Sequence, residues 1–294
     1  MIHDITNGSV CARVDSEGAQ LISLKDGLGT EYIWGGDKTY WGGHAPVLFP
    51  IVGKLRGDKA TIQGVEYEMK RHGVARHQKW QLVENTGDSL TLRVSADEDT
   101  LKQYPFRYML MAKFTLDGVS LINEFTVINM DDKTMSYGFG GHPAFNVPLS
   151  HGTGETFEDY VLEFEQQETL DTQYVNIEDG LIYPDKTQRI LTDEKVIPLR
   201  HELFAVDALV FEGYRSKSIS LYSQKTRMGV EVSLEGFPYL GIWSSPNNGP
   251  FVCIEPWVTT ATTGNEDDVF ENKRNLQFLE PGQSRKHSFT ITLI

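Results

Sequence analysis

Much of the chain alternates between apolar and polar residues with a period of two, the pattern of a β-strand that has one face in a core. The alternating segments are rich in Val, Ile, Phe and Thr, which favour strands. They are residues 90–97, 108–116, 119–129, 160–166, 208–214, 218–224, 228–236 and 287–294. The pattern therefore predicts a protein built mainly of strands.

The segments between these strands carry few helical signals. Asp117-Gly118 separates two alternating arms and predicts a β-hairpin with a two-residue turn. One short helix is expected within residues 97–106, before Pro105. The polar segments 178–193 and 259–275 are expected to be loops. Together these features predict an all-β fold, a large sandwich or barrel, formed by residues 1–294 as one domain.

Charge and cysteine content narrow the class of protein. The formal net charge of −14 argues against nucleic acid and anionic membrane surfaces as partners. No apolar run approaches a membrane span, and the first residues lack a signal-peptide pattern, so the cytoplasm is expected. Cys11 and Cys253 have no metal-ligand spacing, which predicts neither a disulfide framework nor a zinc site. Cys253, in the apolar run FVCIEPW, is expected to be buried.

Two histidines lie in unusual local sequence. His142, in GGHPAFNVPL (140–149), follows two glycines that tolerate strained dihedrals and precedes Pro143, which favours extended backbone. His72 precedes Gly73 among basic residues, and a surface turn is the alternative there. His142 also has a structural alternative. His44 is ambiguous, and a structural or solvated role is expected for the remaining histidines, which are His3, His77, His151, His201 and His287.

Two acidic residues adjoin apolar segments. Glu255 lies in VCIEPW and Asp207 precedes the apolar run ALVF, so each is either a site residue or a carboxylate that reaches solvent. The acidic run 266–268 is expected to be a solvated loop. Nucleophile-elbow, phosphate-loop and dinucleotide motifs are absent from the sequence. Histidines and buried acids without a nucleophile or metal suit proton transfer.

Seven motifs in order resemble those of the aldose 1-epimerases, or galactose mutarotase-like proteins, and within them the LacX-like branch. They extend over nearly the whole chain and are YWGGHAPVLFPIVGKLRG (40–57), YEMKRHGVARHQKW (67–80), YPFRYML (104–110), GGHPAFNVPL (140–149), DALVF (207–211), CIEPW (253–257) and FLEPGQS (278–284). The resemblance implies a large antiparallel β supersandwich with few short helices. It also implies interconversion of the α and β anomers of a free hexose, without metal or cofactor.

The resemblance also implies roles for individual residues. His142 would be the general acid and Glu255 the general base, facing each other across the sugar. These roles require a protonated imidazole and an ionised carboxylate, so a bell-shaped pH profile is expected, with its acidic limb due to Glu255 and its alkaline limb to His142. His72 and Asp207 would contact the sugar. Lys54 would face the site at a position where many members carry Arg, with a basic residue, Arg56, nearby.

Two alternatives stay open. Lys70, Arg71 and Arg76 are basic residues that could bind a phosphate, which would make the substrate a hexose 6-phosphate. A catalytically inactive carbohydrate-binding protein is the second alternative, with stacking residues such as Trp34, Phe145 or Trp257.

The residues 258–264 depart from the Gly-bearing turn that follows IEPW in many members of the family. The expected partner is a small sugar, and the expected assembly is a monomer or homodimer.

Overall fold

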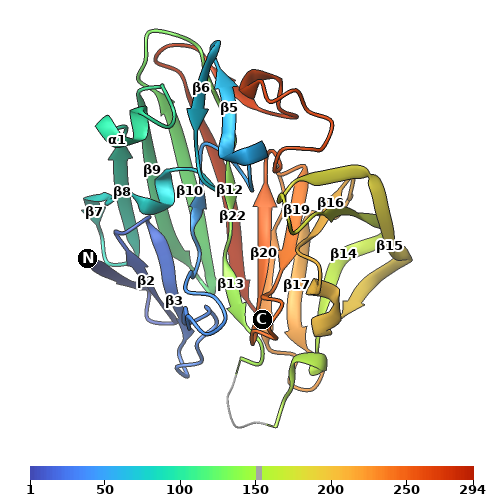
Figure 1. The fold of residues 1–294 in the computed structure, drawn as a ribbon. Coiled ribbons are helices and arrows are strands. Elements are labelled where there is room, and N and C mark those ends of the chain that lie inside the picture. Colours follow the sequence, from blue (N-terminus) through green and yellow to red (C-terminus); the bar gives the residue numbers. More distant parts are fainter. Residues whose placement is uncertain (150–153) are drawn as a thin grey trace.

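Two antiparallel sheets dominate the computed structural model, which describes residues 1–149 and 154–294. The larger has nine strands in the order β15-β14-β17-β18-β22-β10-β9-β8-β7. In Figure 1 the N-terminal strands lie beside β7–β10 on one side, and the β14–β15 hairpin forms the opposite side. The strands of this sheet are β7 (Gln81–Asn85), β8 (Ser89–Ser95), β9 (Tyr108–Asp117), β10 (Ser120–Asn129), β14 (Tyr160–Val175), β15 (Ile182–Pro198), β17 (Ser218–Ser223), β18 (Gly229–Ser233) and β22 (Ser284–Leu293).

A six-stranded sheet, in the order β16-β19-β20-β12-β4 with β13 also paired to β20, packs against the larger one. Its strands are β4 (Val47–Leu48), β12 (Gly140–Gly141), β13 (Ala144–Asn146), β16 (Leu209–Glu212), β19 (Tyr239–Trp243) and β20 (Phe251–Trp257). Every residue of β20 is buried, because this strand lies inside the sheet and is covered on both faces.

Smaller elements complete the fold. A three-stranded sheet and two strand pairs are formed by β1 (Ile2–Thr6), β2 (Val10–Asp15), β3 (Gln20–Asp26), β5 (Lys59–Ile62) with β6 (Val65–Glu68), and β11 (Met135–Tyr137) with β21 (Gln277–Leu279). The only α-helix among the described residues is α1 (Glu98–Leu101), capped by Asp97. The described part of the chain also has 3₁₀ turns at Arg56–Asp58, Ala75–His77, Phe157–Asp159, His201–Phe204 and Phe270–Asn272.

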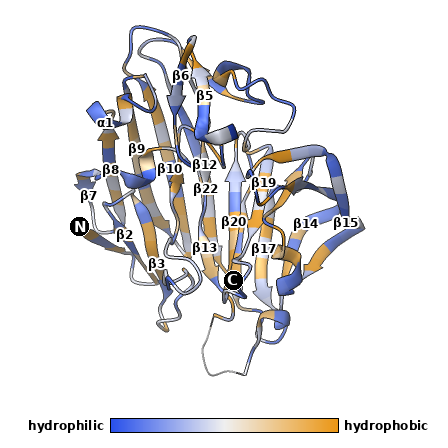
Figure 2. Cartoon of the chain, in the orientation of Figure 1, coloured by the Kyte–Doolittle hydropathy of each residue, from blue (hydrophilic) through white to orange (hydrophobic). Residues whose placement is uncertain are grey.

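The core between the two sheets is formed by side chains at every second position of the strands. Residues of β10 alternate between buried and partly exposed along the whole strand, and the same alternation of hydropathy is visible along β9 and β10 in Figure 2. Phe125 of β10 stacks near Phe289 of β22 and tilts against Phe139, next to the smaller sheet. The expected all-β supersandwich is therefore confirmed, as are the β9–β10 hairpin and the short helix before Pro105. The two-residue turn of the hairpin lies one position later than expected, at Gly118-Val119, because Asp117 ends β9 and pairs with Ser120.

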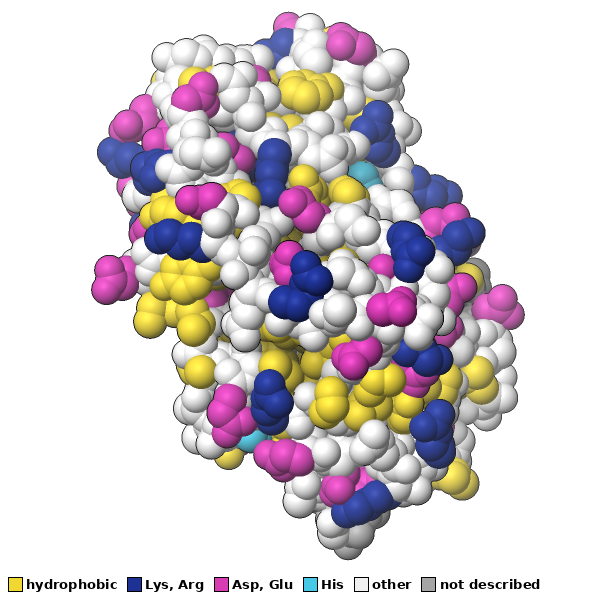
Figure 3. Space-filling model, turned by 90° about the vertical axis from the view of Figure 1, so that its right-hand side faces the viewer, with side chains coloured by type: hydrophobic (Ala, Val, Ile, Leu, Met, Phe, Trp, Pro, Cys, Tyr) yellow, Lys and Arg dark blue, Asp and Glu magenta, His cyan; other side chains and the backbone are white. Residues whose placement is uncertain are grey.

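One sequence-based expectation about the fold is wrong. The polar segment 178–193 is not a loop: from Ile182 it forms β15, which pairs with β14. β15 is an edge strand and most of its side chains are exposed, so its sequence lacks the apolar alternation of a core strand. The face that carries this hairpin mixes acidic and basic side chains, as Figure 3 shows. Among the described residues, no helix has the length and apolar character needed to cross a membrane.

Candidate active site

A cavity of about 320 Å³ brings together four of the predicted site residues, His72, His142, Asp207 and Glu255. Its size suits a small molecule. The six-stranded sheet, the loops around it and the end of the β14–β15 hairpin supply the walls. The other lining residues are Trp41, Gly53, Arg71, Arg76, Val175, Gly180, Ile182, Ala208, Val210, Trp243, Trp257 and Ala261.

Glu255 lies on the fully buried strand β20, and Trp257 holds its carboxylate. Residues two apart on a strand share a face, so the Trp257 side chain lies beside Glu255 and its indole N–H donates to Glu255 Oε2 at 3.2 Å. The indole packs directly over Gly140 and Gly241 on the two neighbouring strands. A Cβ at these glycines would lie 2.7 and 2.4 Å from the indole, so both positions require glycine.

His142 lies between β12 and β13, beside β20. The preceding glycines do not relieve backbone strain, as the sequence suggested, because neither has a positive φ. They allow close packing instead: a Cβ on Gly141 would lie 2.6 Å from the Phe289 ring. The Pro143 carbonyl accepts a hydrogen bond from Ile254 N–H at 3.1 Å. Close packing and β-pairing thus determine where the imidazole lies.

The imidazole of His142 and the carboxylate of Glu255 lie side by side, with Nε2 3.2 Å from Oε1. The expectation that they face each other across the sugar is therefore wrong, since no sugar fits between them. Trp41 stacks on the imidazole with ring centroids 4.9 Å apart, and Trp243 meets it edge-on. Gly43 permits this arrangement, because a Cβ there would lie 2.4 Å from the Trp41 ring.

Burial changes the protonation of this pair. It lowers the pKa of His142 to about 3, and the charges of Arg76 and Arg71 act in the same direction. Burial also raises the pKa of Glu255 well above its usual value, against the opposing effect of the Trp257 hydrogen bond. Both charged forms are disfavoured, so the pair shares one proton over a wide pH range. Ordinary pKa values assigned the acidic limb of the pH profile to Glu255 and the alkaline limb to His142. The shifted pKa values exchange these two assignments.

His72 is held neutral by its surroundings. Its Nδ1 accepts a hydrogen bond from Gly53 N–H at 3.2 Å, which leaves the ring proton on Nε2. Burial lowers its pKa well below the usual value. His72 itself has a φ of 69°, an uncommon conformation for a residue other than glycine, and such strain is typical of functional sites. The next residue must be glycine, because a Cβ on Gly73 would lie 2.3 Å from the Phe49 carbonyl oxygen.

A carboxylate and two guanidinium groups line the cavity beside these histidines. Asp207 lies just before β16, and its Oδ1 accepts a hydrogen bond from Ala208 N–H at 2.7 Å. Arg71 Nη1 lies 4.0 Å from Asp207 Oδ2. Arg76 has no ion-pair or side-chain hydrogen-bond partner among the described residues, although it is partly buried. Burial lowers the pKa of Arg76, and the Arg71 charge acts in the same direction.

Three basic residues named from the sequence, Lys54, Arg56 and Lys70, are not in the cavity wall. Lys54 does not line it, and the stem of its side chain lies against Gly180, where a Cβ would be 2.9 Å from Lys54 Cδ. The Lys70 amine pairs on the surface with Asp58 at 3.2 Å and Glu68 at 2.7 Å. Of the basic residues considered from the sequence, Arg71 and Arg76 are therefore the ones that line the cavity.

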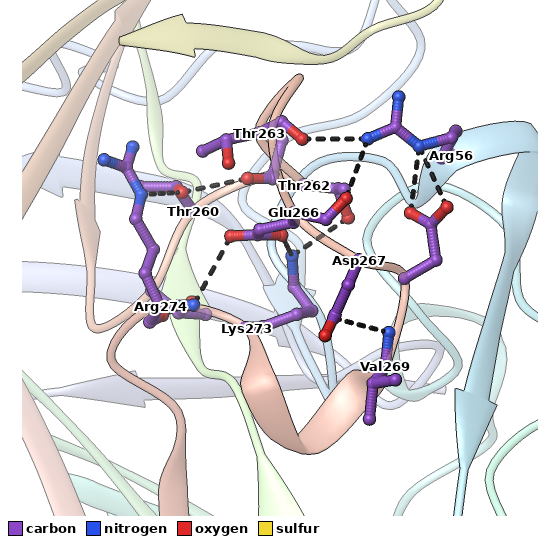
Figure 4. A network of polar contacts seen from close by, with 12 residues as sticks. Arg56, Thr260, Thr262, Thr263, Glu266, Asp267, Val269, Lys273 and Arg274 are labelled. Carbon is purple, nitrogen blue, oxygen red and sulfur yellow. Dashed lines mark hydrogen bonds and ion pairs between the residues drawn. The ribbon is translucent and has the colours of Figure 1, made fainter. Parts of the chain in front are cut away.

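The acidic run 266–268 lies in a loop with Asp267 exposed, as expected, but Glu266 and Asp268 form ion pairs. Figure 4 shows the network around Glu266. Glu266 pairs with the buried Lys273 at 3.2 Å, and the Lys273 amine also donates to Thr262 Oγ1 at 3.0 Å. Asp268 pairs at 2.9 Å with Arg56, which points toward this loop rather than toward the cavity. These ion pairs order the segment 259–275.

This ordered segment holds one wall of the cavity. Ile182 N–H donates to the Thr262 carbonyl at 3.0 Å, and Gly264 N–H donates to the Ile182 carbonyl at 2.8 Å. The tip of the β14–β15 hairpin is thereby attached to the segment 259–275. Gly180 and Ile182, from the hairpin tip, line the cavity. The sequence does not predict this wall, because the tip belongs to a polar segment without the alternation of a core strand.

Of the three aromatic residues considered from the sequence, one lines the cavity and two do not. Trp257 lines the cavity, whereas Trp34 and Phe145 pack in the core. Trp41 and Trp243, which sequence reasoning did not select, do line it. The signal for Trp41 was present in the WGGH motif. Among the other histidines, His287 has the expected structural role, buried with Nε2 2.9 Å from the Tyr137 hydroxyl; His151 lies outside the described residues.

Comparison with known proteins shows the family to which this chain belongs. The aldose 1-epimerase profile matches residues 1–292. The chain belongs to the aldose 1-epimerase family. It is 35% identical to the plasmid-encoded protein LacX of Lactococcus lactis subsp. lactis over 300 residues, with full coverage of both chains.

Solved structures of similar proteins support the same assignment. A galactose mutarotase related enzyme from Lactobacillus acidophilus superposes with a TM-score of 0.94 at 32% identity, covering 100% of this chain and 97% of the other. A galactose mutarotase-like protein from Lactobacillus casei gives a TM-score of 0.92 at 28% identity with full coverage of both. The family and these structures support an isomerase function of the mutarotase type.

Proposed function

We propose that this protein is a mutarotase that interconverts the α and β anomers of a free hexose. The observation that carries the proposal is the side-by-side pair of His142 and Glu255 in a sugar-sized cavity. The anomeric hydroxyl and the ring oxygen of a pyranose are both bonded to C1. Two neighbouring proton-transfer groups therefore match two neighbouring oxygens on the same carbon.

In the proposed reaction, the proton that the pair shares first passes from Glu255 to His142; Glu255 then takes the proton of the C1 hydroxyl while His142 donates a proton to the ring oxygen. The bond between C1 and the ring oxygen breaks, and C1 becomes an aldehyde. Rotation about the C1–C2 bond presents the other face of the aldehyde. Ring closure then reverses both proton transfers, so the pair again holds one proton. His72 Nε2–H donates to a sugar oxygen, and the Asp207 carboxylate accepts from sugar hydroxyls.

A phosphorylated hexose is the second candidate substrate. Arg76 lines the cavity without an acidic partner among the described residues, and Arg71 lies close enough for its charge to lower the Arg76 pKa. An unpaired guanidinium group such as that of Arg76 favours an anionic substituent on the sugar. Neutral hexose remains the first candidate because Arg71 already lies 4.0 Å from Asp207.

Anomer exchange measured by polarimetry tests the proposal and separates the alternatives. Freshly dissolved α-galactose, α-glucose and glucose 6-phosphate are compared at equal concentrations, with Glu255→Gln protein as the control for contaminating activity. Acceleration by the wild-type protein alone supports a mutarotase, and the preferred sugar identifies the substrate class. Sugar binding without acceleration would instead identify a non-catalytic carbohydrate-binding protein.

A further inference from the structure

We propose that His142, Glu255 and Cys253 form a site for Zn²⁺, and that zinc bound there inhibits the enzyme. One donor atom from each residue lies within 4.8 Å of the other two, and all three residues are buried. Sequence spacing predicted no zinc site, because Cys253 and His142 are far apart in the chain. The antiparallel pairing of β13 with β20, which sets Cys253 opposite Ala144, brings them together.

The position of Cys253 favours this assignment. Cys253 and Glu255 lie two residues apart on β20 and therefore share the face that meets the cavity. The cysteine packs in a cluster with Trp41 and Trp243, which line the cavity. His142 and Glu255 line the cavity, whereas Cys253 does not, but its thiol lies within 4.8 Å of a donor atom of each.

The donor set favours zinc over the common hard cations. One imidazole nitrogen, one carboxylate oxygen and one thiolate suit Zn²⁺, whereas Mg²⁺ and Ca²⁺ prefer oxygen ligands only. Zinc binds such atoms at about 2.0–2.3 Å, which puts neighbouring donors roughly 3.3–3.8 Å apart. The His142 nitrogen and Glu255 oxygen are already 3.2 Å apart. A modest movement of the cysteine side chain would complete three protein ligands, with the fourth position open to the cavity.

Charge balance also favours the ion in this buried place. Zinc binding releases the thiol proton of Cys253 and the proton shared by His142 and Glu255 to solvent. The product combines Zn²⁺ with a thiolate, a carboxylate and a neutral imidazole, so its net charge is zero. A neutral complex avoids the cost of burying an uncompensated charge. The ion would occupy both groups that the proposed reaction uses for proton transfer, so inhibition rests on the proposed function while metal binding does not.

The test uses the fact that the chain has only two cysteines, Cys11, which is exposed, and Cys253. Wild-type, Cys11→Ala, Cys253→Ser and Cys253→Ala proteins are titrated with Zn²⁺ while anomer exchange is followed, with Mg²⁺ as the control ion. Each rate is normalised to that of the same variant without metal. In parallel, Cd²⁺ is added and the ultraviolet cadmium–thiolate absorption is recorded, a readout that needs no catalytic activity.

We expect Zn²⁺ but not Mg²⁺ to inhibit wild-type and Cys11→Ala proteins, with recovery after chelation. Loss of a direct ligand should raise the inhibitory zinc concentration in both Cys253 variants by on the order of tenfold or more. The cadmium–thiolate band should persist in Cys11→Ala and disappear in the Cys253 variants. Equal inhibition of all four proteins, or a band that requires Cys11, would overturn the site. A band from Cys253 in a protein that exchanges no anomers would sustain the site and refute the proposed function.

Should neither Cys253 variant fold, wild-type and Cys11→Ala proteins still decide the matter. With Cys11 removed, Cys253 is the one thiol left in the chain. A cadmium–thiolate band in folded Cys11→Ala protein therefore assigns the ion to Cys253, and its absence excludes the site.

Discussion

Two buried pairs of a nitrogen base and a carboxylate have the same separation in this protein but different surroundings. His142 and Glu255 are 3.2 Å apart in the cavity, and Lys273 and Glu266 are 3.2 Å apart beneath the segment 259–275. The Lys273 amine has a second partner in Thr262, and Glu266 also accepts from Arg274 N–H. Burial lowers the pKa of Lys273, but the Glu266 charge and hydrogen bond oppose that shift.

The pair of His142 and Glu255 lacks such compensation. Glu255 accepts one further hydrogen bond, from Trp257, and nearby Arg76 and Arg71 lower the pKa of His142 further. Burial therefore dominates, and the neutral form of the pair, with its proton on Glu255, is favoured over the ion pair. The comparison teaches that the separation of two groups does not determine their role. The hydrogen bonds and charges around them decide whether the pair is a fixed ion pair or a neutral pair that holds one proton.

The largest effect is expected from Glu255→Gln. Glutamine still accepts the Trp257 hydrogen bond, so the fold should persist, but it cannot remove the C1 proton. General-base catalysis is commonly worth about 10²–10⁴-fold, and we expect kcat to fall by that order. Polarimetry and thermal melting on one preparation measure both effects. Wild-type turnover combined with a lowered Tm would show that Glu255 is structural.

The matching change in the other pair is Lys273→Met. It leaves Glu266 largely buried without its partner, and breaking a buried pair costs about 3–5 kcal/mol of stability. Urea unfolding measures this loss. Because the segment 259–275 supports the cavity wall through Ile182, KM should rise more than kcat falls. Stability close to that of wild type would mean that the ion pair contributes little and that the comparison fails.

The pH profile of kcat/KM tests the protonation of the His142–Glu255 pair. Below the lowered pKa of His142, about 3, the pair holds two protons and no base remains. Above the raised pKa of Glu255, the pair loses its last proton and no acid remains. We therefore expect a broad plateau through neutral pH, with an acidic limb due to His142 and an alkaline limb due to Glu255.

The same pKa shift affects stability. The unfolded chain protonates His142 below about pH 6.5, whereas the folded protein keeps it neutral. Stability should therefore decline as the pH falls from about 6.5 toward 3, with no contribution from His142 above that window. Imidazole ¹⁵N NMR of His142 reports its charge directly. An ordinary titration near pH 6.5 would contradict the assignment and restore the limbs expected from the sequence.

The smallest of these effects is expected from Asp207→Asn, which removes a charged acceptor for sugar hydroxyls. Such hydrogen bonds contribute about 1.5–3 kcal/mol, so KM should rise roughly tenfold or more while kcat stays within a few-fold. Lys54→Ala is the matched control, because Lys54 does not line the cavity, and its KM should be close to that of wild type. Steady-state polarimetry over a range of sugar concentrations separates the two constants.

Several features were predictable because they depend on neighbours in the sequence. Alternation with a period of two identified the strands of the core, and Asp117-Gly118 identified the β9–β10 hairpin. Family motifs selected His72, His142, Asp207 and Glu255, which the structure brings into one cavity. The strand β15 escaped prediction because an edge strand exposed to solvent needs no apolar face.

By itself, the sequence determined the all-β class and most of the polar residues of the site. Only the tertiary structure decided that Glu255 touches His142, that Arg76 lines the cavity whereas Lys54 does not, and that Cys253 lies beside the His142–Glu255 pair. Periodicity records which face of a strand is buried. The pKa of a buried group depends instead on charges and donors contributed by distant segments, and these meet only when the sheets pack.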